Sequence, residues 1–118
     1  MFELCTTTNE TAFAFMNLGI SLLYLQEYEH AEKILTKANI LDTSNPNVWG
    51  YMTLVLLKKG QKTNGLEQNA FQALKESIRL KIDNTDLMLD IGEAFMAVGD
   101  NNTAKKALEY ALQTRANH

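Results

Sequence analysis

Residues 85–111, TDLMLDIGEAFMAVGDNNTAKKALEYA, carry the most regular pattern in this chain of 118 residues. Apolar residues recur at helical spacing on both sides of Gly99, which predicts two short amphipathic helices over about 85–98 and 101–116. The glycine favours a tight turn between them, and Asp100 is the expected cap residue of the second helix. This stretch is therefore predicted to be a helical hairpin.

Gly92 and Ala104, one in each predicted helix, are small enough to let the two helices pack closely. An earlier stretch that begins near Ala12 repeats the pattern, because Leu18-Gly19 stands where Ile91-Gly92 stands in the later one. Another hairpin, the first in chain order, is therefore expected near the start of the chain.

This first hairpin is predicted to have helices over about 10–25 and 28–41, with a turn at Gln26-Glu27 that lacks the usual glycine. Its second helix carries the aromatic, small, large apolar and small residues of the pattern: Tyr28, Ala31, Leu35 and Ala38. Residues 1–11 are interpreted as a lead-in, with Thr8 or Asn9 as the helix cap and with Met1, Phe2 and Leu4 able to pack onto the hairpin.

The middle of the chain is predicted to form one more hairpin, the second in chain order. Its first helix begins at Asn45-Pro46, a cap residue followed by a proline whose missing N–H costs nothing at the first helical position. Trp49 follows, Met52-Thr53 replaces the apolar-glycine pair, and Lys59-Gly60 is predicted to end the helix.

The second helix of this middle hairpin fits the pattern only if five residues are inserted within Gln61–Gln68, where Asn64-Gly65 indicates a turn. The insertion places a small, a large and a small residue in register: Ala70, Leu74 and Ser77. The helix is expected to end near Ile82, and Asn84 or Thr85 is expected to cap the next one.

Three such units in phase, over about residues 12–116, resemble the tetratricopeptide-repeat family. The resemblance implies an all-α fold, a right-handed α-solenoid of three helix-turn-helix repeats at about 12–45, 46–84 and 85–118. Residues 12–118 would form this domain. Within the family, residues 45–51, NPNVWGY, look like repeats of cilia- and flagella-associated members.

The family's first helices line a concave groove that grips a peptide, a helix or an extended segment of another protein. Its groove positions are the second, fifth, ninth, twelfth and thirteenth of each repeat. Carried over, they are Phe13, Met16, Ile20, Leu23 and Tyr24; then Asn47, Gly50, Leu54, Leu57 and Lys58; then Asp86, Leu89, Glu93, Met96 and Ala97, with Asp90 beside them.

The predicted groove is apolar at its N-terminal end and acidic at its C-terminal end, where Asp86, Asp90 and Glu93 share one helix face. These carboxylates would repel the C-terminal carboxylate that chaperone-binding members hold. An amphipathic helix or apolar segment with basic residues at one end is the expected partner, within a larger assembly such as the axoneme.

Other interpretations stay open. Residues 1–11 could fold over the first helix, or the groove could pack on itself. The chain could be a structural segment of a longer solenoid, with its groove or end faces packed in a complex. The basic residues of the middle repeat could meet an acidic protein, although such lysines more often form a solvated helix face; they are Lys58, Lys59, Lys62, Lys75, Arg79 and Lys81.

The remaining features argue against other functions. The net charge of −3 and the lack of interleaved aromatic residues disfavour nucleic acid, and no apolar run is long enough to predict a membrane span. Cys5, His30 and His118 form no spacing for a metal, cofactor or catalytic pair, so no enzyme is predicted. The single cysteine and the absence of a secretory signal predict a cytoplasmic protein, with the cilium or axoneme as a narrower location.

Overall fold

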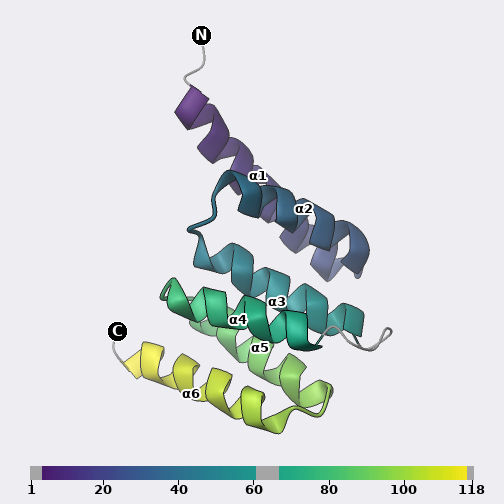
Figure 1. The fold of residues 1–118 in the computed structure, drawn as a ribbon, viewed down its shortest axis with the longest axis vertical. Coiled ribbons are helices and arrows are strands. Elements are labelled where there is room, and N and C mark those ends of the chain that lie inside the picture. Colours follow the sequence, from purple (N-terminus) through teal and green to yellow (C-terminus); the bar gives the residue numbers. More distant parts are fainter. Residues whose placement is uncertain (1–3, 61–66, 117–118) are drawn as a thin grey trace.

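The computed structural model describes the backbone of residues 4–60 and 67–116, and side chains from residue 10 onward outside 61–67. All regular structure in these ranges is helical, in agreement with the predicted all-α fold (Figure 1). The helices are α1 (Leu4–Tyr24), α2 (Tyr28–Leu41), α3 (Pro46–Gly60), α4 (Glu67–Arg79), α5 (Thr85–Ala97) and α6 (Asn101–Ala116).

Consecutive helices pair as hairpins, α1 with α2, α3 with α4 and α5 with α6, and the three hairpins stack in chain order (Figure 1). Between hairpins, α3 packs against α2 and more lightly against α1, and α5 packs against α3. The predicted solenoid of three helix-turn-helix repeats is confirmed.

The first helix differs from the prediction, because α1 begins at Leu4 and not near residue 10. No proline or glycine stands before Gly19 to end a helix, so the segment taken as a lead-in continues α1. Thr8 and Asn9 therefore lie inside the helix and not at its start. The predicted packing of Met1, Phe2 and Leu4 falls outside the residues whose side chains are described, as does the predicted turn at Asn64-Gly65.

Close contact between the two helices of a hairpin depends on a small residue in the first helix. A Cβ atom at Gly19 would lie 2.6 Å from Leu35 Cγ, and one at Gly92 would lie 2.6 Å from Leu108 Cδ2. Thr53 takes this place in the middle hairpin; it is fully buried, and its hydroxyl donates to the Trp49 carbonyl at 2.9 Å. The hydroxyl is therefore satisfied inside the helix.

The register predicted for α4 is also confirmed. Ala70 and Ser77 are fully buried, as are the corresponding small residues of α2, Ala31 and Ala38. The Ser77 hydroxyl donates to the Leu74 carbonyl at 2.7 Å, which satisfies a polar group that an alanine would not bring. A five-residue insertion before α4 is what brings these residues into phase.

Three helices end in the same left-handed turn. The residues with positive φ are Gln26 after α1, Lys81 after α4 and Gly99 after α5, at φ angles of 64°, 63° and 90°. At each one the next residue donates its N–H to a carbonyl five residues back; for example, Glu27 donates to Leu22 at 2.9 Å. The residue with positive φ itself donates its N–H to a carbonyl three residues back, and the two bonds satisfy the last free carbonyls of the helix.

Side chains cap the starts of three helices as predicted. Before α3, Asn45 Oδ1 accepts the Asn47 N–H at 2.9 Å. Asn84 Oδ1 accepts the Leu87 N–H at 3.1 Å before α5, and Asp100 Oδ1 accepts the Thr103 N–H at 3.1 Å before α6. Each bond satisfies one of the N–H groups that a helix leaves unpaired at its start. Both helices of the third hairpin therefore begin at a side-chain cap.

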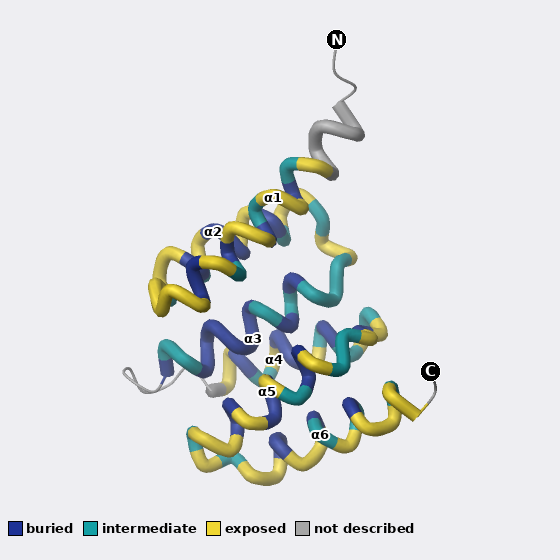
Figure 2. Tube along the Cα trace, turned by 180° about the vertical axis from the view of Figure 1, so that it is seen from behind, coloured by how far each residue is buried: buried dark blue, intermediate teal, exposed yellow. Residues whose placement is uncertain are grey.

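The hydrophobic core is centred on the middle of the stack. Helix α3 is buried along most of its length, whereas α2 and α6 expose their outer faces (Figure 2). No helix in the described ranges is both long and apolar enough to cross a membrane.

Gly19→Ala is expected to destabilise the chain. The added methyl group collides with Leu35 near its branch point, which costs about 1–3 kcal/mol, while the loss of a helical glycine returns about 0.5–1 kcal/mol. Denaturant unfolding should show the net loss. Ser21→Ala, at an exposed position on the same helix, is the control; a Gly19→Ala variant as stable as the wild type would mean that Leu35 moves aside at no cost.

Gln26→Gly is expected to stabilise the chain by about 1 kcal/mol, because it removes the strain of a side chain in the left-handed conformation. Gly99→Ala makes the reverse change at the equivalent turn of the third hairpin, where the new methyl group meets nothing within 4 Å. Thermal unfolding should therefore shift in opposite directions for the two variants, and shifts of equal sign would contradict this account of the turns.

Candidate functional site

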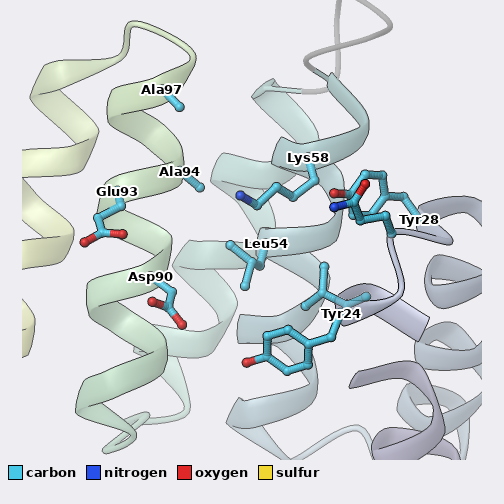
Figure 3. A pocket seen from close by; sticks show the side chains of 10 residues that line it. Tyr24, Tyr28, Leu54, Lys58, Asp90, Glu93, Ala94 and Ala97 are labelled. Carbon is cyan, nitrogen blue, oxygen red and sulfur yellow. The ribbon is translucent and has the colours of Figure 1, made fainter. Parts of the chain in front are cut away.

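A hollow of about 500 Å³ opens on the concave side of the stack, between α1, α3 and α5 (Figure 3). It is formed where the C-terminal end of α1 and the turn after it face the C-terminal halves of α3 and α5. Its lining residues are Leu23, Tyr24, Gln26, Tyr28, Leu54, Lys58, Asp90, Glu93, Ala94 and Ala97.

The floor of the hollow is apolar. Leu23 and Leu54 are buried at its base, and Leu54 lies between Tyr24 and Asp90 in Figure 3. Ala94 and Ala97 are short, so the α5 side leaves room for a guest side chain. A floor of this kind gains free energy when a partner removes it from water.

One wall of the hollow is acidic. Asp90 and Glu93 come from consecutive turns of α5, and Asp86 lies one turn before them on the same helix. Partial burial raises the pKa of Asp90, and the nearby Glu93 and Asp86 carboxylates raise it further, while Lys58 works in the opposite direction. The wall therefore carries more negative charge than Lys58 balances.

Tyrosine side chains surround this wall. Tyr24 is 68% exposed and lines the hollow from α1. Tyr51 of α3 lies beside it: burial raises the pKa of its phenol, and Tyr24 and Asp90 add to the increase, against the effect of a hydrogen bond with Asn84. The aromatic rings give the hollow large faces with polar ends, which suit a protein partner.

Five of the ten residues singled out from the sequence meet in the hollow: Leu23, Tyr24, Leu54, Asp90 and Glu93. Lys58 and Ala97, two other predicted groove positions, join them. The predicted groove positions that line the hollow therefore come from the C-terminal end of α1 and from the parts of α3 and α5 that face it.

Leu57 and Met16 were wrongly predicted to line the groove. Leu57 is fully buried, because the twelfth position of a repeat faces the first helix of the next one, and α5 packs against α3. Met16 is buried as well, and its sulfur accepts the Asn45 side-chain amide at 3.6 Å. Both side chains belong to the contacts between hairpins.

Other predicted positions lie away from the hollow. Phe13 is 61% exposed and Ile20 half-buried, both on α1 without reaching the described lining. Asp86 is exposed and lies 3.7 Å from Arg115 of α6. A Cβ atom at Gly50 would lie 2.7 Å from Leu87 Cδ2, so this glycine also serves the packing between hairpins.

Three lining residues were missed, Gln26, Tyr28 and Ala94, and so was Tyr51 beside the hollow. Gln26 belongs to the turn after α1 and Tyr28 begins α2, whereas the family positions used for the prediction fall only on first helices. Tyr51 directly follows Gly50, which was a predicted groove position. An aromatic residue next to such a position is the sequence signal that could have identified Tyr51.

The basic residues of the middle repeat are mostly engaged within the chain. Lys59 Nζ lies 2.7 Å from Glu32 of α2, and Arg79 lies 2.8 Å from Glu76. The Lys75 ammonium lies 5.6 Å from the centre of the Phe71 ring. Lys62 falls outside the described residues. These contacts favour a solvated helix face over a second binding surface.

Among the described residues, no group of three or more histidine, cysteine, aspartate or glutamate side chains is arranged to hold a metal ion.

Comparison with known proteins identifies the relatives of this helical array. A family model described as the cilia and flagella-associated protein 70 C-terminal domain matches residues 1–118. The chain is 35% identical over 92 residues to cilia- and flagella-associated protein 70 of Macaca fascicularis and of Homo sapiens. The alignments cover 78% of this chain but only 9% and 8% of those proteins.

A solved structure supports the fold. The crystal structure of MamA superimposes with a TM-score of 0.68 over 92% of this chain and 61% of that chain, at 23% identity. Because the family model matches residues 1–118, the chain belongs to the family of the cilia and flagella-associated protein 70 C-terminal domain, a tetratricopeptide-repeat domain.

Proposed function

We propose that the concave hollow binds a segment of another protein in a ciliary or flagellar assembly, and that the chain serves there as a scaffold. The segment is an amphipathic helix or an apolar stretch with basic residues at one end. The observation that carries this proposal is the apolar floor beside an acidic wall in one open hollow.

The apolar part of the segment would lie on Leu23, Leu54 and Ala97. Tyr24 is positioned to fold over it, because its ring is largely exposed at the rim of the hollow. Tyrosines that bury a ring and keep the hydroxyl in water are frequent anchors in protein interfaces. Contact with this floor would supply most of the affinity.

The basic end of the segment would lie against Asp90 and Glu93. Lys58 is the one basic side chain among the ten described lining residues, so an incoming ammonium or guanidinium group meets a net negative wall. Charge complementarity of this kind fixes the orientation of a partner and speeds its association. A partner that presents a carboxylate would be repelled.

The cellular setting that we propose rests on the names of the relatives, which are called cilia- and flagella-associated. We place the scaffold in the axoneme or a related structure; a location in the wider cytoplasm stays a prediction. We assign no catalytic role to the α5 carboxylates.

A structural role within a longer solenoid is the second candidate. It is favoured by large apolar side chains that the two ends of the stack leave exposed, among them Leu18 and Leu25 on α1 and Met96 and Leu112 at the other end. It also fits relatives that are more than ten times longer than the matched region.

Reversing the charge of the wall with Asp90→Lys and Glu93→Lys together is expected to lower the capture of proteins from a ciliary extract by at least about ten-fold, since two favourable charge contacts become repulsive. Glu29→Lys together with Glu10→Lys makes the same change in net charge on exposed residues outside the hollow. Quantitative mass spectrometry of the captured proteins compares the three chains. Equal capture by all three would rule out the hollow as the binding site.

Binding should also depend on pH through Asp90. The free chain has a raised Asp90 pKa, and a bound cation would lower it, so binding releases a proton in the pH range between the two values. The affinity for a captured partner should therefore weaken as the pH falls through that range and level off above it. Calorimetry in buffers of different ionisation enthalpy measures the released proton. Asp90→Asn should abolish its share of the release; an unchanged release would exclude this residue.

A further inference from the structure

A second hollow, of about 350 Å³, lies at the C-terminal end of the stack between α5 and α6. It is separate from the concave hollow, since the two share no lining residue. Met96 and Leu112, two of its apolar side chains, are 52% and 63% exposed. Its lining residues are Met96, Asn101, Ala104, Lys105, Leu108, Glu109 and Leu112.

The corresponding face of the first hairpin is already covered by a helix. Met96 occupies the twelfth position of its repeat, where the earlier repeats have Leu23 and Leu57, which are 4% and 0% exposed. Leu108 is half-buried, whereas its counterpart Leu35 is fully buried. The difference arises because α3 packs on the first hairpin, and none of the six described helices packs on this face of the third.

The charges on the two faces differ in a way that specifies the covering helix. At the first junction Glu32 of α2 pairs with Lys59 of α3 at 2.7 Å. Lys105 stands in α6 where Glu32 stands in α2, so the polarity of this contact is reversed on the third hairpin. A helix seated there as α3 is seated on α1 and α2 would need an acidic residue in place of Lys59.

We infer that the hollow between α5 and α6 binds an amphipathic helix of another protein. The helix has apolar residues at the spacing of Val48, Met52 and Val55 in α3, and an acidic residue four positions after the last of them. It lies alongside α5 and α6, with the acidic residue against Lys105 and the apolar stripe on Met96 and Leu112.

A second copy of this chain fits the face less well. Its α1 would bring Leu25 to Lys105, and Ser21 to the place where α3 has Val55. Neither residue carries a negative charge to pair with Lys105, and a hydroxyl would replace an apolar contact. The charge pattern therefore favours a different protein over head-to-tail association of this one.

The test uses a designed helical peptide of fifteen residues that keeps the α3 side chains at positions 48, 52 and 55 on a background of alanine and glutamine. Two versions carry either glutamate or lysine at the position of Lys59. Fluorescence anisotropy measures their binding to the full chain. The glutamate peptide is expected to bind about two- to five-fold more tightly than the lysine peptide, the range of an exposed ion pair.

Lys105→Glu is expected to reverse this preference, and Met96→Lys with Leu112→Lys to abolish binding of both peptides while circular dichroism stays helical. Glu29→Lys, at an exposed position outside both hollows, should leave binding unchanged. The inference is overturned if neither peptide binds, or if Lys105→Glu leaves the preference as it was. It is also overturned if light scattering shows that the chain self-associates and Met96→Lys abolishes this association, because a second copy would then be the occupant.

Discussion

The contact between a residue without a bulky side chain and a leucine across the hairpin governs this structure. Gly19 and Gly92 bring the backbone of α1 and α5 against Leu35 and Leu108, closer than any Cβ atom would allow. Interiors of proteins are packed densely enough that even one methyl group is felt. The spacing within each hairpin therefore sets how the next hairpin can be placed, and with it the curvature of the whole stack.

The concave hollow is a product of that placement. First helices of successive hairpins lie side by side, so side chains from α1, α3 and α5 that are far apart in sequence line one hollow (Figure 3). None of these helices carries a binding site by itself. The apolar floor comes mainly from α1 and α3 and the acidic wall from α5, so the character of the hollow depends on all three repeats.

The sequence allowed the fold to be predicted because its signals are local and repeated. Small residues in phase located the hairpins, and the shift of Ala70 and Ser77 revealed the insertion before α4. The start of α1 was missed because a cap residue such as Asn9 signals a helix start only where the preceding residues do not continue the helix.

The site was predicted only in part, for a physical reason. Position in a repeat says which way a side chain points, but whether it stays accessible depends on the neighbouring hairpin. Leu57 and Met16 point toward neighbours that cover them, while Tyr24 points into open space. Gln26, in the turn after α1, reaches the hollow through the course of the chain there, which no helical periodicity encodes.

The deep burial of α3 has a consequence for how the array comes apart. In a linear array each unit is held by its neighbours, so end units can fray alone while a central unit cannot leave without uncovering both sides. Because α3 contacts helices of both outer hairpins, its loss would strip the shared core from each of them. A pulling force applied to the two ends would therefore peel the outer hairpins first and leave the central one as the last element to yield.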